Sequence, residues 1–231
     1  MFFHEIYLRE LCNRLKIPLL GIDYAAAPDH PYPEGLNDIF QMYMWIINHC
    51  EKELGFKPEK IILAGDSSGG NLSLALTFLI IYMNEFENKK IRLPDLLFGL
   101  YPCCHTSNKN MTLSLASSFE DVMLNINSLF YINKVYRGYY PNELDPFINP
   151  LEANEILLKK LPPCRFMTAT HDPLRDDVIK FIGKLAKIPG LDIKNYEFNN
   201  YQHGFIGNEN EMISGPPKEI FCKEIMDFLK K

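Results

Sequence analysis

The sequence predicts a single α/β domain spanning residues 1–231, built on a mostly parallel sheet with helices on both faces. Three observations lead to this prediction. The chain has 231 residues, 47% of them hydrophobic and 23% charged, which is typical of a globular protein. Short β-rich apolar runs alternate with longer segments whose apolar residues recur at three- and four-residue spacing. The β-rich runs are apolar, as expected for strands of a parallel sheet covered on both faces.

The first half of the chain shows this alternation clearly. The amphipathic spacing in residues 2–15 predicts a helix, and the apolar run IPLLGIDY at 17–24 predicts a strand. Helical spacing returns over 36–54. The run IILAGD at 61–66 predicts a second strand, and the apolar segment that follows predicts a helix over 71–87.

The middle of the chain departs from the pattern. The run LLFGLYP at 96–102 predicts a third strand. Residues 104–163 contain helical patterns, including one at 128–136, that do not lead directly into a strand. We expect this segment to be an insertion over the carboxyl edge of the sheet, the edge where ligands bind in open α/β sheets.

The alternation resumes in the last third of the chain. RFMTATHD at 165–172 and IKNYEF at 193–198 are predicted strands, and residues 176–187 form the predicted helix between them. A final helix is expected over 218–230. Two parallel strands joined by a helix place the ends of both strands at the same edge of the sheet.

Composition and charge exclude some classes of partner. The net charge is −5 and no cluster of Lys and Arg is evident, so we expect no nucleic-acid partner. The longest nearly uninterrupted apolar stretch, residues 72–83, is too short to cross a bilayer, and we expect no transmembrane segment. The oligomeric state is left open.

Cysteine usage and the first residues bear on the compartment. The six cysteines form no C-x-x-C pair and no metal-binding spacing, so free thiols are favoured over disulfides. The first residues carry an acid, Glu5, within an amphipathic segment instead of a basic start followed by an apolar run, which is not the pattern of a signal peptide. We expect a cytoplasmic protein without a metal ion.

The stretch GDSSGG predicts a nucleophile. Gly65 to Gly69 fits G-x-S-x-G, the pattern of a serine held on a strained turn between a strand and a helix. A tight turn of small residues that lets a helix pack closely on a sheet is the simpler alternative. The predicted strand lies directly before Ser67 and the predicted helix follows it, which places Ser67 where the nucleophile interpretation requires it.

A serine nucleophile needs a base and a group that orients the base. His203 lies just beyond the strand at 193–198, and Asp172 ends the strand at 165–172, so both are expected at the sheet edge where Ser67 lies. Their order along the chain, Ser, Asp, His, is that of α/β-hydrolase triads. Asp176 and Asp177 could replace Asp172, although they are better explained as acidic residues at a helix N-terminus.

Four motifs together resemble those of one known family. GDSSGGN, DYAAAPDHPYPEGLND, HDPLRDD and YQHGF resemble motifs of the hormone-sensitive-lipase family of α/β-hydrolases, in the same order and spacing. The resemblance runs from about residue 4 to the C-terminus. It implies the same three roles: Ser67 as nucleophile, His203 as base and Asp172 as orienting acid. The backbone N–H of Ser68, at a position where the family usually has alanine, is the implied oxyanion donor.

One motif of the family is missing. The family takes further oxyanion donors from an HGGG-type turn after its third strand, and the sequence contains no HGGG. That turn would lie roughly ten residues before HEIYLR. We therefore expect the chain to lack the N-terminal part of the fold, or the strand at 17–24 to move into the gap. We expect very slow ester hydrolysis or none, because losing one oxyanion donor costs about 10²- to 10³-fold in turnover.

The leading functional hypothesis is a serine carboxylic ester hydrolase, an esterase or lipase-like enzyme that works through an acyl-enzyme on a small-molecule or lipid ester. It needs no cofactor. A non-catalytic protein that binds small molecules on the same fold is one alternative, and an inactive fragment without the oxyanion loop is another. The segment 119–140 is rich in Phe, Tyr, Leu and Met, which suits an apolar acyl pocket and ordinary core packing equally well.

Overall fold

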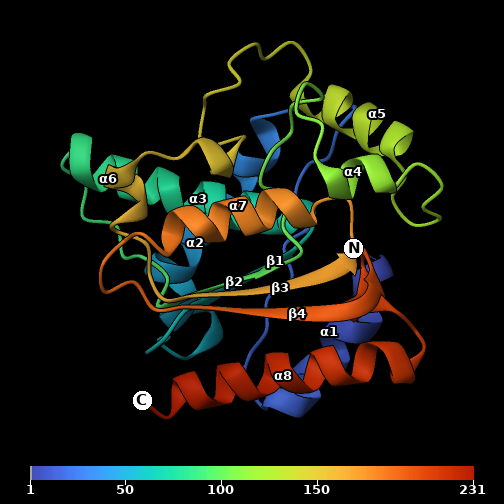
Figure 1. The fold of residues 1–231 in the computed structure, drawn as a ribbon. Helices are drawn as coiled ribbons and strands as arrows, with labels where there is room; N and C mark the ends of the chain where they lie inside the picture. Colours follow the sequence, from blue (N-terminus) through green and yellow to red (C-terminus); the bar gives the residue numbers. More distant parts are fainter. Residues whose placement is uncertain (1) are drawn as a thin grey trace. The chain divides into compact units, whose positions relative to one another are not determined.

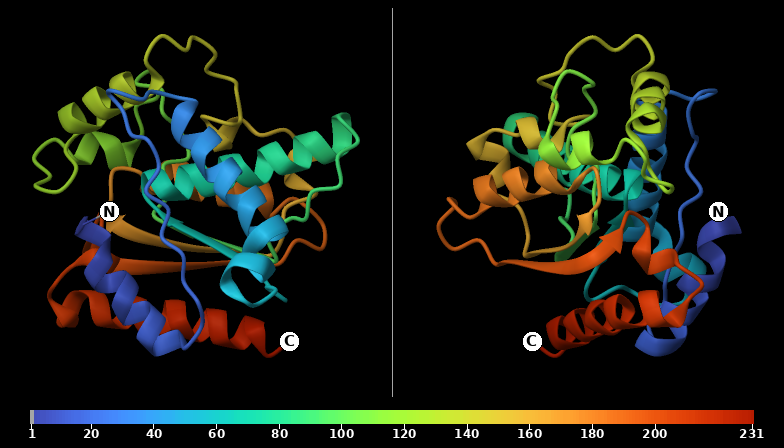
Figure 2. Two further views of the ribbon diagram at one scale, coloured as in Figure 1. Left: turned by 180° about the vertical axis from the view of Figure 1, so that it is seen from behind. Right: turned by 45° about the vertical axis from the view of Figure 1, so that its right-hand side comes forward.

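The computed structural model describes residues 2–231, whose ribbon is drawn in Figures 1 and 2. The chain divides into two compact units. One unit combines the two ends of the chain, Met1–Asp23 and Gly204–Lys231. The other is the continuous segment Tyr24–His203, which holds the sheet and all four residues singled out from the sequence as a candidate site.

The sheet of the larger unit has four parallel strands. They lie side by side in their order along the chain, with every neighbouring pair parallel. The strands are β1 (Ile62–Asp66), β2 (Leu96–Leu100), β3 (Cys164–His171) and β4 (Ile193–Gln202). The parallel sheet expected from the sequence is confirmed, and its carboxyl ends form one common edge.

Helices connect the strands and cover the core. The helices and 3-10 turns of this unit are α2 (Glu34–Leu54), α3 (Ser68–Phe86), α4 (Leu113–Ser117), α5 (Ile126–Arg137), η1 (Pro150–Glu152), α6 (Glu155–Leu158) and α7 (Arg175–Leu185). Helices α3 and α7 lie on the same face of the strands (Figure 1). Phe78 of α3, Phe166 of β3 and Phe181 of α7 are fully buried between these layers. Their rings meet edge to face, an arrangement that adds to the stability from burial.

Helix α2 shows how local sequence sets the end of an element. Leu36, Ile39 and Tyr43 lie at three- and four-residue spacing and are buried, as an amphipathic helix requires. The helix ends at Gly55, whose φ of 78° is left-handed and whose N–H bonds to the carbonyl of Glu51. Glycine adopts this conformation without a steric penalty.

The smaller unit contains only helical elements among its described residues. They are α1 (Phe2–Leu15), η2 (Phe205–Gly207) and α8 (Glu211–Leu229). Tyr7 and Leu11 of α1 and Phe221 of α8 are buried. A partly buried ion pair joins the two long helices, with Lys218 Nζ 2.5 Å from Glu10 Oε2.

The expected strand at residues 17–24 is wrong. These residues form no strand, and the sheet contains β1 to β4 alone among the described residues. A strand exists only when a neighbour accepts and donates its backbone hydrogen bonds, and this segment has none of the ladder that defines one. The alternative in which it moves over to pair with β1 is therefore wrong too.

Two further boundaries differ from the sequence pattern. Helix α8 begins at Glu211, seven residues before the expected start, because the side chain of Asn210 caps it by accepting the N–H of Met212. Strand β4 continues to Gln202, beyond the expected end at 198. In the segment 104–163, helices α4 and α5 lie toward the carboxyl ends of the strands (Figure 1). The limits of the proposed insertion stay a prediction.

Two expectations drawn from composition can be compared with the structure. All six cysteines are free thiols, and each except Cys12 is buried. Within residues 2–231, no helix combines the length and the apolar character needed to span a lipid bilayer.

Candidate active site

Ser67 occupies the turn between β1 and α3. Its φ of 54° lies in the left-handed region, which is unusual for a residue with a side chain and marks a strained turn. Two backbone hydrogen bonds fix the turn to the neighbouring strand: Ser67 N–H donates to the carbonyl of Leu100 at 2.9 Å, and Cys103 N–H donates to the carbonyl of Ser67 at 3.1 Å. The strain is thus held in place from the β2 side.

The glycines around Ser67 are required by close packing. A Cβ on Gly65 would lie 2.2 Å from the carbonyl oxygen of Gly69, and one on Gly70 would lie 2.6 Å from Cβ of Pro102. Neither distance is tolerated between heavy atoms. Small residues therefore let α3 begin directly after β1, as the packing alternative for GDSSGG proposes. The same close packing holds Ser67 on the turn between the two elements.

The side chains of Ser67, His203 and Asp172 form a continuous hydrogen-bonded chain. His203 Nε2 lies 2.8 Å from Ser67 Oγ, and His203 Nδ1 lies 2.8 Å from Asp172 Oδ2. Asp172 is 1% exposed, and its Oδ1 accepts the N–H of Leu174 at 2.8 Å. A carboxylate accepts hydrogen bonds, so Nδ1–H of the imidazole donates to it and Nε2 is free to accept the hydroxyl proton of Ser67.

A register irregularity at the end of β4 brings His203 opposite Asp172. Ala169 pairs with Phe198, and His171 pairs with Gln202, so β4 has four positions where β3 has two. In a regular ladder Asp172 would face residue 201. The extra residues of β4 move His203 to that place instead, as bulges near functional sites often do.

Tyr101 supports the imidazole from the side. Its ring meets that of His203 edge to face, with centroids 4.9 Å apart, and Tyr101 is 1% exposed. The contact limits rotation of the His203 ring. The sequence pattern assigned no role to Tyr101.

The alternative acids, and His171 next to Asp172 in the sequence, have other partners. Asp176 Oδ2 accepts the N–H of Ser114 at 3.0 Å, and Asp177 pairs with Lys180 at 3.1 Å. His171 Nε2 lies 3.4 Å from Asn200 Oδ1. Of the acids considered, Asp172 is the one that contacts His203.

Ser68 is the first residue of α3. The first N–H groups of a helix have no partner within the helix, which makes the Ser68 N–H a free donor beside Ser67. The Ser68 side chain is exposed, and its Oγ lies 3.1 Å from the hydroxyl of Tyr24. Tyr24 comes from the motif DYAAAP, and the contact was not evident from its position in the sequence.

Asn71 links the turn to distant loops. It is 2% exposed, and its Nδ2 donates to the carbonyls of Cys103 at 2.7 Å and Ile148 at 3.0 Å. These bonds join the segment after β2 and the segment before η1 to α3. Its position directly after GDSSGG was the only signal in the sequence.

Part of the segment 119–140 packs into a small core beside the site. Leu124, Ile126 and Leu129 are buried together with Leu174, two residues after Asp172. Other apolar side chains of the segment are exposed: Phe119, Val122, Met123, Tyr131, Ile132 and Tyr139. Ordinary core packing therefore accounts for Leu124, Ile126 and Leu129.

Cys103, close to the turn, is not a rival nucleophile. Burial raises the pKa of its thiol to about 12, so the thiol stays protonated at neutral pH. It donates to the carbonyl of His105 at 3.4 Å. Nor do the described residues contain a group of His, Cys, Asp and Glu side chains arranged to hold a metal ion.

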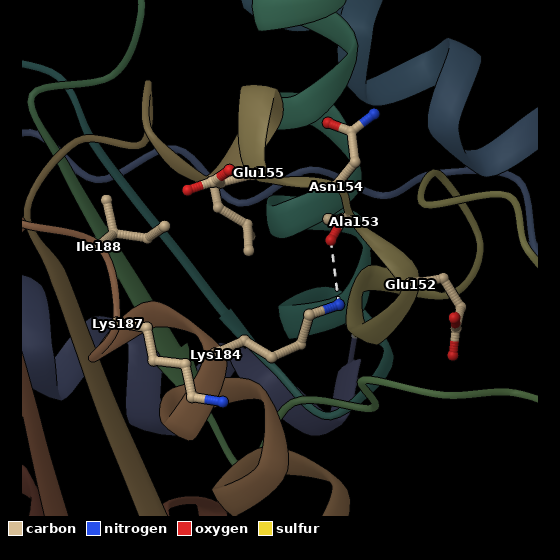
Figure 3. Close-up of a pocket in the computed structure, with 8 residues that line it drawn as sticks. Glu152, Ala153, Asn154, Glu155, Lys184, Lys187 and Ile188 are labelled. Atoms are coloured by element: carbon tan, nitrogen blue, oxygen red, sulfur yellow. Dashed lines mark hydrogen bonds between the residues drawn. The ribbon is translucent and has the colours of Figure 1, made fainter.

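A separate hollow of about 430 Å³ lies between η1, α6 and α7 (Figure 3). Lys184 points into it and donates to the carbonyls of Leu151 at 2.6 Å and Ala153 at 3.0 Å. The remaining lining is Glu152, Asn154, Glu155, Leu158, Lys187 and Ile188. None of the lining residues is one of the candidate site residues, so we assign the hollow no role in the chemistry.

A serine on a strained strand–helix turn, facing a histidine and an acid at neighbouring strand ends of a parallel sheet, is the arrangement of an α/β hydrolase. Residues 1–207 match the family described as alpha/beta hydrolase fold. The chain belongs to this family.

The similar proteins carry esterase and lipase names. The chain is 29% identical over 204 residues to the carboxylic ester hydrolase LipN of Mycobacterium tuberculosis, covering 88% of this chain and 52% of LipN. It is 33% identical over 135 residues to hormone-sensitive lipase of Mus musculus, covering 58% of this chain and 17% of the lipase. The resemblance to a hormone-sensitive-lipase-like hydrolase is confirmed. The matched part of this chain spans about half the length of LipN and a smaller share of the mouse lipase.

Solved structures show the same fold. A hyperthermophilic esterase from Pyrobaculum calidifontis superimposes with a TM-score of 0.85 at 25% identity, covering 98% of this chain and 71% of the esterase. Carboxyl esterase 2 from Tuber melanosporum has a TM-score of 0.85 at 21% identity, covering 96% of this chain and 71% of that protein. At these sequence identities, the structural similarity establishes the fold alone.

Proposed function

We propose that the protein is a serine carboxylic ester hydrolase. The observation that carries the proposal is the bridging imidazole of His203, which lies 2.8 Å from both Ser67 Oγ and Asp172 Oδ2. Direct contact of this kind is what proton transfer between a nucleophile and its base requires. The names of the relatives support the same class of reaction.

The first half-reaction forms an acyl-enzyme. His203 Nε2 takes the proton of Ser67 as Oγ bonds to the carbonyl carbon of the ester, and the carbonyl π electrons move to its oxygen. Asp172 holds the imidazole in the required tautomer and stabilises the imidazolium. The imidazolium then gives its proton to the departing alkoxide as the C–O bond breaks. The alcohol leaves, and the acyl group stays on Ser67.

The second half-reaction releases the acid. A water molecule gives a proton to His203 and attacks the acyl carbon, and the imidazolium returns the proton to Ser67 as the acyl bond breaks. The sum is ester plus water to acid plus alcohol. In both halves the Ser68 N–H donates to the negatively charged oxygen of the tetrahedral intermediate. The substrate we propose is a small-molecule or lipid ester.

Labelling with a fluorophosphonate probe tests the proposal, because the probe reacts with an activated serine. We expect a covalent adduct on Ser67, located by peptide mass spectrometry, and none in Ser67→Ala. The control variant is Ser117→Ala, an exposed serine of α4, and it should be labelled as the unmodified chain is. Ser67-dependent release of p-nitrophenol from p-nitrophenyl butyrate is the accompanying assay.

The outcome also separates the alternatives. A chain that takes no label, or one labelled equally well without Ser67, would overturn the esterase proposal. A folded, unlabelled chain that binds esters would then be a non-catalytic binding protein.

A further inference from the structure

The side chain of Ser68 lies beside the place where negative charge develops during the proposed reaction. Its N–H is the proposed oxyanion donor, and Oγ belongs to the same residue. Bond lengths and staggered rotamers keep the N and Oγ atoms of a serine roughly 3 to 4 Å apart. An oxygen that accepts the Ser68 N–H can therefore also lie within hydrogen-bond distance of the Ser68 hydroxyl.

Tyr24 holds that hydroxyl through a contact of 3.1 Å between the two oxygen atoms. Either oxygen could donate, but a phenol is the stronger acid and hence the better donor. Burial raises the pKa of Tyr24 above its ordinary value, which keeps the phenol protonated at neutral pH. With Tyr24 donating to Ser68 Oγ, the hydroxyl proton of Ser68 is free for another acceptor.

The position of Tyr24 is itself set by the start of α2. The side chain of Asp38 accepts the N–H of the next residue, Ala25, at 2.8 Å. Gly35 leaves room for the tyrosine ring, since a Cβ there would lie 3.1 Å from Tyr24 Cδ2. The phenol is therefore presented to Ser68 by packing and by a hydrogen bond to the main chain.

We propose that the Ser68 hydroxyl, oriented by Tyr24, is an additional hydrogen-bond donor to the oxyanion of the tetrahedral intermediate on Ser67. The proposal rests on the esterase function and adds two residues to it: Ser68 Oγ touches the reacting oxygen, and Tyr24 is a positioning residue that acts through it.

The test measures the rate constant for fluorophosphonate labelling of Ser67, since phosphonylation also places negative charge on an oxygen. Ser68→Ala keeps the N–H and removes the hydroxyl, and we expect labelling to be at least tenfold slower. Loss of an enclosed oxyanion donor typically costs about 10²- to 10³-fold. The loss here should be smaller than that because Ser68 is exposed. Ser68→Thr keeps a hydroxyl and should restore the rate to within about threefold.

Tyr24 is tested through its coupling to Ser68. Tyr24→Phe should slow labelling less than Ser68→Ala, and the double variant should be no slower than Ser68→Ala alone, because both act through one hydroxyl. Tyr82→Phe, a partly exposed tyrosine of α3, is the matched control and should leave the rate unchanged. With p-nitrophenyl butyrate, the loss in Ser68→Ala should fall on kcat and not on KM, since the bond forms in the transition state.

The outcomes separate this proposal from the one on which it rests. Labelling of Ser67 at an unchanged rate in Ser68→Ala would overturn the role of the hydroxyl and leave the esterase proposal standing. Additive losses in the double variant would overturn the role assigned to Tyr24. A chain whose Ser67 takes no label at all would overturn both proposals together.

Discussion

Replacing Asp172 by asparagine should reverse the hydrogen bond that makes His203 a base. Asp172 Oδ1 accepts the N–H of Leu174, and Oδ2 faces His203 Nδ1, each at 2.8 Å. In Asp172→Asn the amide oxygen keeps the bond to Leu174, because an NH₂ group cannot accept it. The NH₂ group then faces Nδ1 and donates to it.

The consequence is carried across the ring. An imidazole that accepts at Nδ1 carries its proton on Nε2, which faces Ser67 Oγ at 2.8 Å and can no longer take its proton. In serine proteases this reversal costs about 10⁴-fold in turnover, equivalent to about 5.4 kcal/mol of activation free energy. We expect a loss of this size here, with the fold unchanged because the two side chains are nearly the same in shape.

The assay is again the rate of fluorophosphonate labelling of Ser67, together with p-nitrophenyl butyrate hydrolysis. Asp177→Asn is the matched control. Asp177 was a candidate for the orienting acid, and it pairs with Lys180 instead. It should label within about twofold of the unmodified chain. Labelling of Asp172→Asn at the normal rate, or an equal loss in Asp177→Asn, would refute the assignment of Asp172.

Three further predictions concern stability. Gly65→Ala should lower the free energy of unfolding by about 3 kcal/mol, since the new Cβ would lie 2.2 Å from a carbonyl oxygen. Gly183→Ala, with open space at that site, should raise the free energy of unfolding by about 0.5 to 1 kcal/mol. Urea titration compares the two variants, and equal effects would contradict the packing argument. Tyr136→Phe should raise the free energy of unfolding by up to about 1 kcal/mol, because the buried Tyr136 hydroxyl has no hydrogen-bond partner among the described residues; a clear loss in thermal melting would point to a partner. Burial lowers the pKa of His105 below 6.5, so the unfolded chain binds the proton first and the free energy of unfolding falls as the pH drops below about 6.5. His105→Gln should reduce this fall in urea titrations between pH 7 and 5. An unchanged pH dependence would contradict the role given to His105.

Local sequence patterns were sufficient to predict most of the sheet and the candidate site residues. The apolar run before GDSSGG and the helical spacing after it placed β1 and α3, and so placed Ser67 at a strand–helix junction. Asp172 and His203 were predictable because parallel strands end at one edge, which makes residues at strand ends neighbours whatever lies between them. These inferences depend only on periodicity and on connections that are regular in α/β folds.

The tertiary structure decided the features that depend on distant partners. Residues 17–24 have the composition of a strand, but strand formation needs a neighbour's backbone groups, and composition does not show whether a neighbour is there. The irregularity that sets His203 opposite Asp172 depends on the pairing of β3 with β4. The contact of Tyr24 with Ser68 joins residues 44 positions apart, and it exists because Gly35 and Asp38 fix the tyrosine in space. Long-range packing of this kind leaves no periodic signal along the chain.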